Sequence, residues 1–150
     1  MTDVFDTRTR SKNMAAIKSK DSSPELFFRK GLWHLGFRYV LHKSEIPGHP
    51  DIYLPCYRAA VFIHGCFWHR HQNCSYTTTP ATNVEFWKNK FQRNVQRDKL
   101  VAEELRQINI RRLVVWECTI RKMRKDIEFS TEIFSKTAGF FKSDKMELEL

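Results

Sequence analysis

One stretch of eleven residues, 64–74, limits what this chain can be more than any other part of it. The stretch holds three of the six histidines and two of the four cysteines, with two adjacent aromatic residues among them. An apolar run, 59–63, precedes it and has the length and composition of a strand that is buried on both faces. Core packing does not require so many metal-binding side chains at a strand end, so the stretch predicts a site.

A metal centre is the first function that this stretch predicts. Cys66, His71 and Cys74 lie within nine residues of one another, and Cys118 follows a second apolar strand predicted over 112–116. Three thiolates and one imidazole complete the tetrahedral shell of a structural Zn²⁺ that has no open position for water. The alternative is that Cys66 and Cys118 are small buried hydrophobic residues and that His71 is exposed.

The other arrangements of cysteine and histidine fit less well. A zinc deaminase needs a Glu two residues after a ligand histidine and a Cys-x-x-Cys element, and 64–74 offers neither. The remaining cysteine, Cys56, lies in a predicted turn and is expected to bind nothing.

A carboxylate site is predicted beside the same stretch. Asp51 opens a short strand, 51–54, after Pro50. If this strand neighbours 59–63, Asp51, His64 and the main-chain carbonyl of Ile63 share one edge of the sheet. A carboxylate at such an edge can hold Mg²⁺, which prefers oxygen ligands.

His69 remains free if His71 binds zinc, and it would then serve as a general base toward the water that attacks a phosphate. Glu25, at a predicted helix start, would orient a metal-bound water. Each role has a structural alternative: Asp51 as a strand cap, His69 as a surface histidine, and Glu25 as a charge that favours a helix N-terminus.

The aromatic residues Phe67 and Trp68 lie between the predicted ligands, where both cannot easily be buried. Rigidly held apolar side chains of this kind can enter a base stack and wedge it open. Trp87 falls on the apolar stripe of a predicted helix, 84–107, and on that pattern alone belongs to the core.

The charge of the chain is strongly uneven. The formal net charge is +9, and residues 88–125 contain 12 Lys and Arg against 4 Asp and Glu, whereas residues 126–150 contain 3 against 6. A basic band of this kind predicts a polyanionic partner such as DNA or RNA, although a solvated helix face is the alternative. Its basic residues include Lys88, Arg93 and Arg97, and an N-terminal arm adds Arg8, Arg10 and Lys12.

The pattern of elements predicts an α/β fold with a small mixed central sheet flanked by helices. Helices are expected over 13–20, from Ser23 as N-cap to Gly36, over 84–107 with a capping box of Thr82 and Glu85, and over 119–129. Strands are expected over 37–42, 51–54, 59–63 and 112–116. The division is a basic arm and short helix at 1–20, a catalytic domain at 21–130 and a C-terminal tail at 131–150.

The chain contains no apolar run of the length of a membrane span and no signal peptide pattern at its start. We therefore expect a cytoplasmic protein, whose cysteines are thiols or metal ligands rather than disulfides.

Several of these motifs together resemble one family. The most specific are His-Gly-Cys-Phe-Trp-His at 64–69 and Trp-Glu-Cys at 116–118, joined by Ser-Pro-Glu at 23–25, Gly-His-Pro-Asp at 48–51 and Glu-Phe-Trp at 85–87. Over about residues 8–128 the chain resembles the very short patch repair (Vsr) DNA mismatch endonucleases of bacteria.

The resemblance implies a fold like that of type II restriction endonucleases and a bacterial protein that acts on the nucleoid. It implies an enzyme that uses Mg²⁺ to nick the strand carrying the thymine of a T·G mismatch, on its 5′ side. Such mismatches arise when 5-methylcytosine deaminates. The implied roles are catalysis by Asp51, His69, His64 and Glu25, zinc binding by Cys66, His71, Cys74 and Cys118, and wedging by Phe67, Trp68 and Trp87.

Two departures from the family and two rival functions accompany this reading. Some relatives have Thr in place of Ile63, so that only the carbonyl of Ile63 can bind metal here, and the segment between His71 and Cys74 is one residue longer than in some relatives. The rivals are a zinc-stabilised DNA-binding module without catalysis and a restriction-type nuclease that cuts matched duplex. A monomer suits a one-strand cut, and a mismatch-repair protein is a partner that these residues do not specify.

Overall fold

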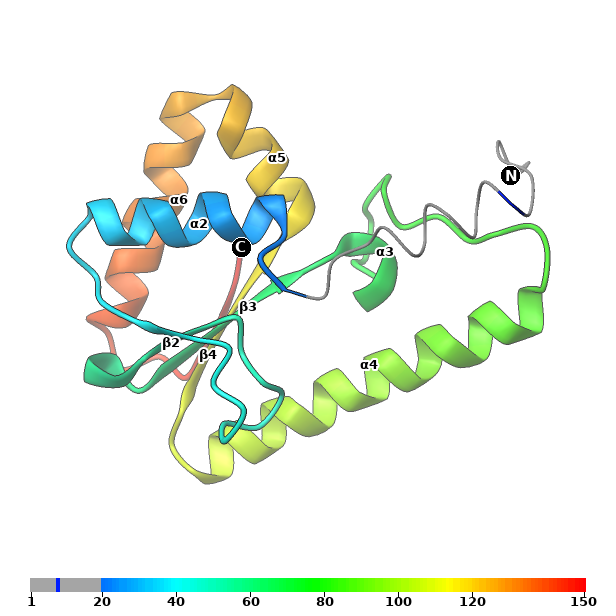
Figure 1. Ribbon diagram of the computed structural model, residues 1–150, viewed down its shortest axis with the longest axis horizontal. Coiled ribbons are helices and arrows are strands. Elements are labelled where there is room, and N and C mark those ends of the chain that lie inside the picture. The colour runs from blue at the N-terminus through cyan, green and yellow to red at the C-terminus, as the bar shows by residue number, and fades with distance from the viewer. Residues whose placement is uncertain (1–7, 9–19) are drawn as a thin grey trace.

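The structure, a computed structural model, describes Arg8 and residues 20–150 (Figure 1). Most of the predicted helix at 13–20 therefore lies outside the described residues, as do Arg10 and Lys12. In chain order the elements are α2 (Ser23–His34), β1 (Val40–Leu41), β2 (Ile52–Leu54), the 3₁₀ helix η1 (Pro55–Tyr57), β3 (Ala59–His64), α3 (Cys66–His69), α4 (Val84–Gln107), β4 (Arg111–Trp116), α5 (Glu117–Lys125), α6 (Ile127–Phe141) and β5 (Glu147–Glu149).

The strands form one mixed sheet in the order β1-β2-β3-β4-β5, which confirms the predicted fold class. The pairs β1–β2 and β2–β3 are antiparallel, whereas β3–β4 and β4–β5 are parallel. The register of β3 and β4 places His64 beside Trp116. Because both strands end together, the stretch 64–74 emerges next to Cys118.

Both faces of the sheet are covered by helices. Helices α2, α5 and α6 lie on one face and α4 crosses the other (Figure 1). The side chains of each strand alternate between these layers, as the two-residue period of a strand requires. Val61, Leu113 and Val115 pack toward α2, α5 and α6, while Phe62 and Val114 pack toward α4. This double coverage explains why 59–63 is apolar at every position.

Several predicted boundaries need correction. The N-cap of α2 is Ser22, not Ser23, whose hydroxyl instead accepts a hydrogen bond from Arg124 at 2.7 Å. Helix α4 begins after Asn83, so the capping box predicted from Thr82 does not form the start of this helix.

The strand predicted over 37–42 shrinks to Val40–Leu41. Its first residue, Phe37, is buried in the core, with its ring 5.1 Å from that of Phe141 and 5.6 Å from that of Tyr57.

The C-terminal part of the chain contains more structure than the sequence pattern predicted. The helix expected over 119–129 ends at Lys125, and Asp126 has an extended backbone that breaks it. The Asp126 carboxylate accepts a hydrogen bond from the Phe129 N–H at 3.0 Å, which caps α6. After α6 the chain adds β5 to the sheet edge, where its backbone pairs with β4. Among the described residues, no helix is both long and apolar enough to span a membrane.

One arginine, Arg111, fastens α6 to the start of β4. Its guanidinium donates hydrogen bonds of 2.6–3.2 Å to the carbonyl oxygens of Tyr57, Phe140, Phe141 and Ser143. Three of these carbonyls lie at the end of α6 or just beyond it, where a cation also interacts favourably with the helix dipole. Arg111 therefore satisfies a helix terminus that would otherwise bury several unpaired acceptors.

We expect the substitution Arg111→Met to lower the free energy of unfolding by about 2–4 kcal/mol, because it leaves these carbonyls without a charged donor. The matched control Lys136→Met removes an exposed pair with Glu132 on α6 and should cost less than about 1 kcal/mol. Urea denaturation of both variants measures the difference. Equal losses would contradict the anchoring role of Arg111.

Candidate active site and metal centre

The carboxylate of Asp51 lies against the end of β3. Its Oδ2 accepts a hydrogen bond of 2.7 Å from the Ile63 N–H. The antiparallel pairing of β2 and β3 explains this contact. Ile52 lies beside Val61, so Asp51, which precedes Ile52, lies beside the last residues of β3. Asp51 and the backbone of Ile63 thus share the sheet edge that was predicted for them.

Asp51 is in an environment that disfavours its negative charge. Burial is the largest cause and raises its pKa to about 7, against the lowering effect of the Ile63 N–H. The charge of Glu25 and a hydrogen bond to Glu25 raise the pKa of Asp51 further. A buried carboxyl group beside a second carboxylate, which disfavours its charge, is typical of a site for a cation.

Glu25 is almost fully buried, with 2% of its surface exposed, although a charge at a helix start is normally solvated. Its Oε2 accepts hydrogen bonds from the Asp21 N–H at 3.1 Å and from Arg29 at 3.2 Å. The same oxygen lies 3.4 Å from Nε2 of His42. The start of α2 therefore places the Glu25 carboxylate beside Asp51, and Arg29 and His42 contact the same carboxylate.

His64 and His69 form a stacked pair at the other wall of the site. Their ring centroids are 3.8 Å apart and the ring planes differ by 4°. Burial is the largest cause that lowers the pKa of His64 to about 3, and the charge of His69 is the second cause. His64 is therefore neutral at physiological pH. The helix α3 produces this arrangement, because it turns the chain after β3 and brings His69 back over His64.

Asp98 on α4 completes the pair and was not among the predicted site residues. Its Oδ2 lies 2.7 Å from Nδ1 of His69. A carboxylate accepts hydrogen bonds, so in the neutral imidazole this contact favours the tautomer with the proton on Nδ1 and the lone pair on Nε2. The sequence carries one signal for it: Asp98 is the only acid between Glu85 and Glu103 in an otherwise basic helix.

A cleft of about 470 Å³ joins these groups, and its walls include Asp51, Ile63, His64, His69 and Asp98. Basic side chains, Arg97 and Arg112, also face it, so the cleft combines carboxylates, imidazoles and guanidinium groups.

Gly48 closes one side of this cleft. It has a φ of +80°, and a Cβ there would lie 2.5 Å from Val101 and 3.0 Å from Phe62. Only glycine allows the loop before Asp51 to approach α4 so closely.

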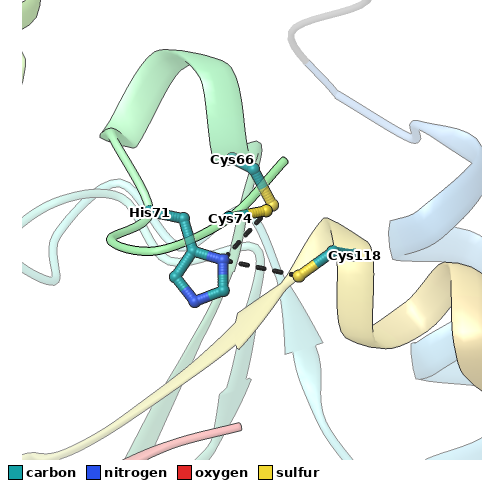
Figure 2. Close-up of side chains that lie close together, drawn as sticks. All are labelled: Cys66, His71, Cys74 and Cys118. Atoms are coloured by element: carbon teal, nitrogen blue, oxygen red, sulfur yellow. Dashed lines mark hydrogen bonds between the residues drawn. The ribbon is translucent and has the colours of Figure 1, made fainter. Parts of the chain in front are cut away.

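The second site is a cluster of three thiols and one imidazole (Figure 2). Cys66, His71, Cys74 and Cys118 each offer one donor atom, and these atoms all lie within 4.8 Å of one another. Nδ1 of His71 lies 3.6 Å from Sγ of Cys66 and 3.4 Å from Sγ of Cys118. The structure thus brings together the four residues predicted as metal ligands, while Cys56 is exposed elsewhere.

The donor set of this cluster fits a soft divalent cation. Burial raises the pKa of the Cys66 thiol to about 12 and also raises that of Cys118, so the cluster without a cation keeps these thiols protonated. A cation in the middle would supply the missing positive charge and bind the thiolates. The ring of His71 is held in place by Trp116, whose centroid is 4.1 Å away in a parallel stack.

The three predicted wedge residues lie together near the start of α4. The Phe67 ring is 5.0 Å from that of Trp68 and 5.8 Å from that of Trp87. Phe67 and Trp68 are half-buried, whereas only 7% of Trp87 is exposed because Phe91 and its neighbours cover it. Lys90 lies over the Trp68 ring at 5.1 Å, which adds a positive charge beside the exposed aromatic surface.

The basic residues predicted to contact a polyanion lie at the surface. Lys88, Arg93 and Arg97 are exposed on α4, and Arg8 is exposed as well. Between them, Phe86, Lys90 and Asn94 line a shallow groove that continues from the aromatic cluster toward Arg97.

Comparison with known proteins gives consistent matches. The family model described as DNA mismatch endonuclease Vsr matches residues 2–75. The chain is 43% identical over 121 residues to the type II nicking enzyme V.NmeAIP of Neisseria meningitidis serogroup A, covering 81% of this chain and 86% of that protein. It is 41% identical over 125 residues to the DNA mismatch endonuclease Vsr of Escherichia coli K12, covering 83% and 80%.

A third relative, the type II nicking enzyme V.XorIIP of Xanthomonas oryzae pv. oryzae, is 36% identical over 120 residues, covering 80% of this chain and 88% of that protein. The mixed sheet flanked by helices agrees with the restriction-endonuclease-like fold expected of such proteins. From these matches and this fold, the chain belongs to the DNA mismatch endonuclease Vsr family.

Proposed function

We propose that this protein nicks one strand of duplex DNA on the 5′ side of the thymine of a T·G mismatch, by Mg²⁺-dependent hydrolysis of a phosphodiester. The observation that carries the proposal is that the Asp51 carboxylate and the His69–Asp98 pair face one cleft. Membership of a family of DNA mismatch endonucleases supports the substrate class.

Asp51 and the main-chain carbonyl of Ile63 would hold the Mg²⁺, and Glu25 would orient a water beside it. Their oxygens suit a hard cation, and burial together with the neighbouring Glu25 raises the pKa of Asp51, so a bound cation would favour its charged form. When bound, Mg²⁺ polarises phosphoryl oxygens and stabilises the leaving oxygen.

His69 is the general base in this proposal. Asp98 accepts a hydrogen bond from the Nδ1–H, so that Nε2 can take a proton from the attacking water. His64, neutral and stacked on His69, keeps the imidazole in place and excludes water from its face. The arrangement resembles other sites in which a carboxylate orients the base through its second nitrogen.

Phe67, Trp68 and Trp87 are the proposed wedge. Inserting flat side chains costs a few kcal/mol per base step, and less at a mismatch, whose stacking and pairing are already weaker. The tight packing of Trp87 against Phe67 supports a role as the base of the wedge, with the half-exposed Trp68 as its leading edge. Lys88, Arg93 and Arg97, with Arg8, Arg10 and Lys12 of the arm, would bind the phosphate backbone.

We assign Zn²⁺ to the cluster of Cys66, His71, Cys74 and Cys118. Three thiolates and an imidazole, the four donors that the described residues bring together here, suit a closed tetrahedral site of structural type. Zinc there would tie α3, which carries Phe67, Trp68 and His69, to the start of α5, which carries Cys118.

We expect the purified protein to nick a T·G duplex in the presence of Mg²⁺ and to leave matched duplex largely intact. A panel of T·G duplexes with varied flanking pairs measures this and defines the sequence context. Asp51→Asn should lower nicking by at least about a thousandfold with little change in DNA binding, because it removes the metal ligand. The control Asp144→Asn, at an exposed carboxylate, should nick normally.

Tight, salt-dependent binding without nicking in any context would favour a DNA-binding module instead. Cleavage of both strands of matched duplex would favour a restriction-type nuclease.

The pH dependence of nicking should shift with the Mg²⁺ concentration. Below a pH of about 7 Asp51 holds a proton that the cation must displace, so that affinity for Mg²⁺ rises with pH and levels off above about 7. At limiting Mg²⁺ the nicking rate should rise up to about tenfold per pH unit below this value. Saturating Mg²⁺ should move the midpoint to lower pH. If the midpoint of the pH dependence stays the same at all Mg²⁺ concentrations, Asp51 is not the Mg²⁺ ligand.

The metal content should depend on the proposed zinc ligands alone. Elemental analysis should find about one zinc per chain in the wild type and in Cys56→Ala. Cys118→Ala should lose the zinc and melt at a lower temperature, because zinc binding contributes to folding. Equal zinc in Cys118→Ala and Cys56→Ala would disprove the assigned ligand set.

A further inference from the structure

Four rings form a continuous row between the active site and the metal centre. His69 stacks on His64 at 3.8 Å, His64 meets the edge of Trp116 at 5.3 Å, and Trp116 stacks on His71 at 4.1 Å. Trp116 therefore touches both a proposed catalytic histidine, His64, and the histidine of the metal centre, His71. A contact that fixes the orientation of the Trp116 ring therefore also restrains the His71 ring that is stacked on it.

The C-terminal strand β5 supplies that support. Its backbone is fixed beside β4 by hydrogen bonds of 2.9 Å, from the Leu150 N–H to the Val114 carbonyl and from the Trp116 N–H to the Leu150 carbonyl. Leu148 packs toward the α2 side of the sheet, so the alternating Glu147 and Glu149 face the side of Trp116. The indole N–H of Trp116 lies 3.4 Å from Oε2 of Glu149.

The orientation of His71 leaves one ring nitrogen for such a partner. Its Nδ1 faces the cysteine sulfurs, while Nε2 lies at the edge of the ring that points away from them (Figure 2). His71, Trp116 and Glu149 also line one cleft of about 610 Å³. The Glu149 carboxylate lies near enough for its charge to act on the His71 ring.

We propose that Glu149 is a positioning residue of the metal centre, which holds Trp116 and His71 in the orientation that lets Nδ1 bind the metal. The inference rests on the zinc assignment of the proposed function. Carboxylates that act on the second nitrogen of a ligand histidine fix its orientation and raise its basicity. Here the carboxylate comes from the last strand of the sheet and acts through the indole and through its charge.

The exposure of the Glu149 side chain determines how strongly its loss should weaken metal binding. About 57% of the Glu149 side chain is exposed, so water and salt screen its charge. Losing an outer-shell partner usually weakens metal binding about 10–100-fold. We therefore expect a loss of about threefold to tenfold at low salt, at or below the lower end of that range.

The chain offers a matched control two residues away. Glu147 is on the same strand and the same face, but its carboxylate pairs with Arg106 at 2.6 Å and is not among the groups that act on His71. A substitution there removes an equal charge from β5 without touching the Trp116–His71 stack.

The test is the rate at which zinc leaves the full chain after an excess of chelator is added, followed with a chromophoric zinc indicator. Glu149→Gln should release zinc about threefold to tenfold faster than the wild type, and the difference should shrink in high salt because it depends on charge. Glu147→Gln should match the wild type. Melting curves of both variants check that β5 remains paired.

Equal zinc release from Glu149→Gln and the wild type would overturn the inference, as would equal acceleration in Glu147→Gln. If the wild type binds no zinc, the zinc assignment fails together with this inference. Mg²⁺-dependent nicking of the T·G duplex is measured separately, so either failure can be told apart from failure of the nuclease proposal.

Discussion

The parallel pairing of β3 with β4 is the constraint on which the rest of the structure depends. Its register puts His64 beside Trp116, and both strands end at the same level. His69 and the ligands of the thiol cluster follow from that level: α3 begins just after β3, and α5 continues from β4 with Cys118 in its first turn. A shift of one residue between the two strands would place His64 and Trp116 on opposite faces of the sheet, and the contacts of both sites would be lost.

Burial disfavours charged side chains in both the active site and the metal centre at this edge of the sheet. Asp51 and Glu25 are two acids buried side by side, whereas His64 is a base that burial keeps neutral. Burial disfavours the negative charge of Asp51, so a metal ion bound beside that carboxylate would offset the cost. In the thiol cluster, burial raises the pKa of the Cys66 and Cys118 thiols, and a cation among the four donors would favour their thiolates.

Sequence patterns predicted the mixed sheet, α4 and the four donors of the thiol cluster, because apolar runs and Cys/His density are local signals. They missed Asp98, because it lies on α4, 29 residues from His69, and only packing brings the two together. They also missed α6 and β5: Asp126 interrupts the helical pattern, and a strand of three residues has too short an alternation to stand out. They placed the N-cap of α2 at Ser23 instead of Ser22, one residue too late, since either of two adjacent serines can cap a helix.

The two outer strands of the sheet have a consequence for solubility at high concentration. An open sheet edge offers unpaired backbone groups to any passing strand, and aggregation often begins there. Here β1 is two residues long, and β5 is three residues long with acidic side chains at both ends. Two copies that met through β5 would bring their glutamates together and repel each other, so the same carboxylates that face Trp116 and Arg106 also keep the sheet from growing into a neighbouring molecule.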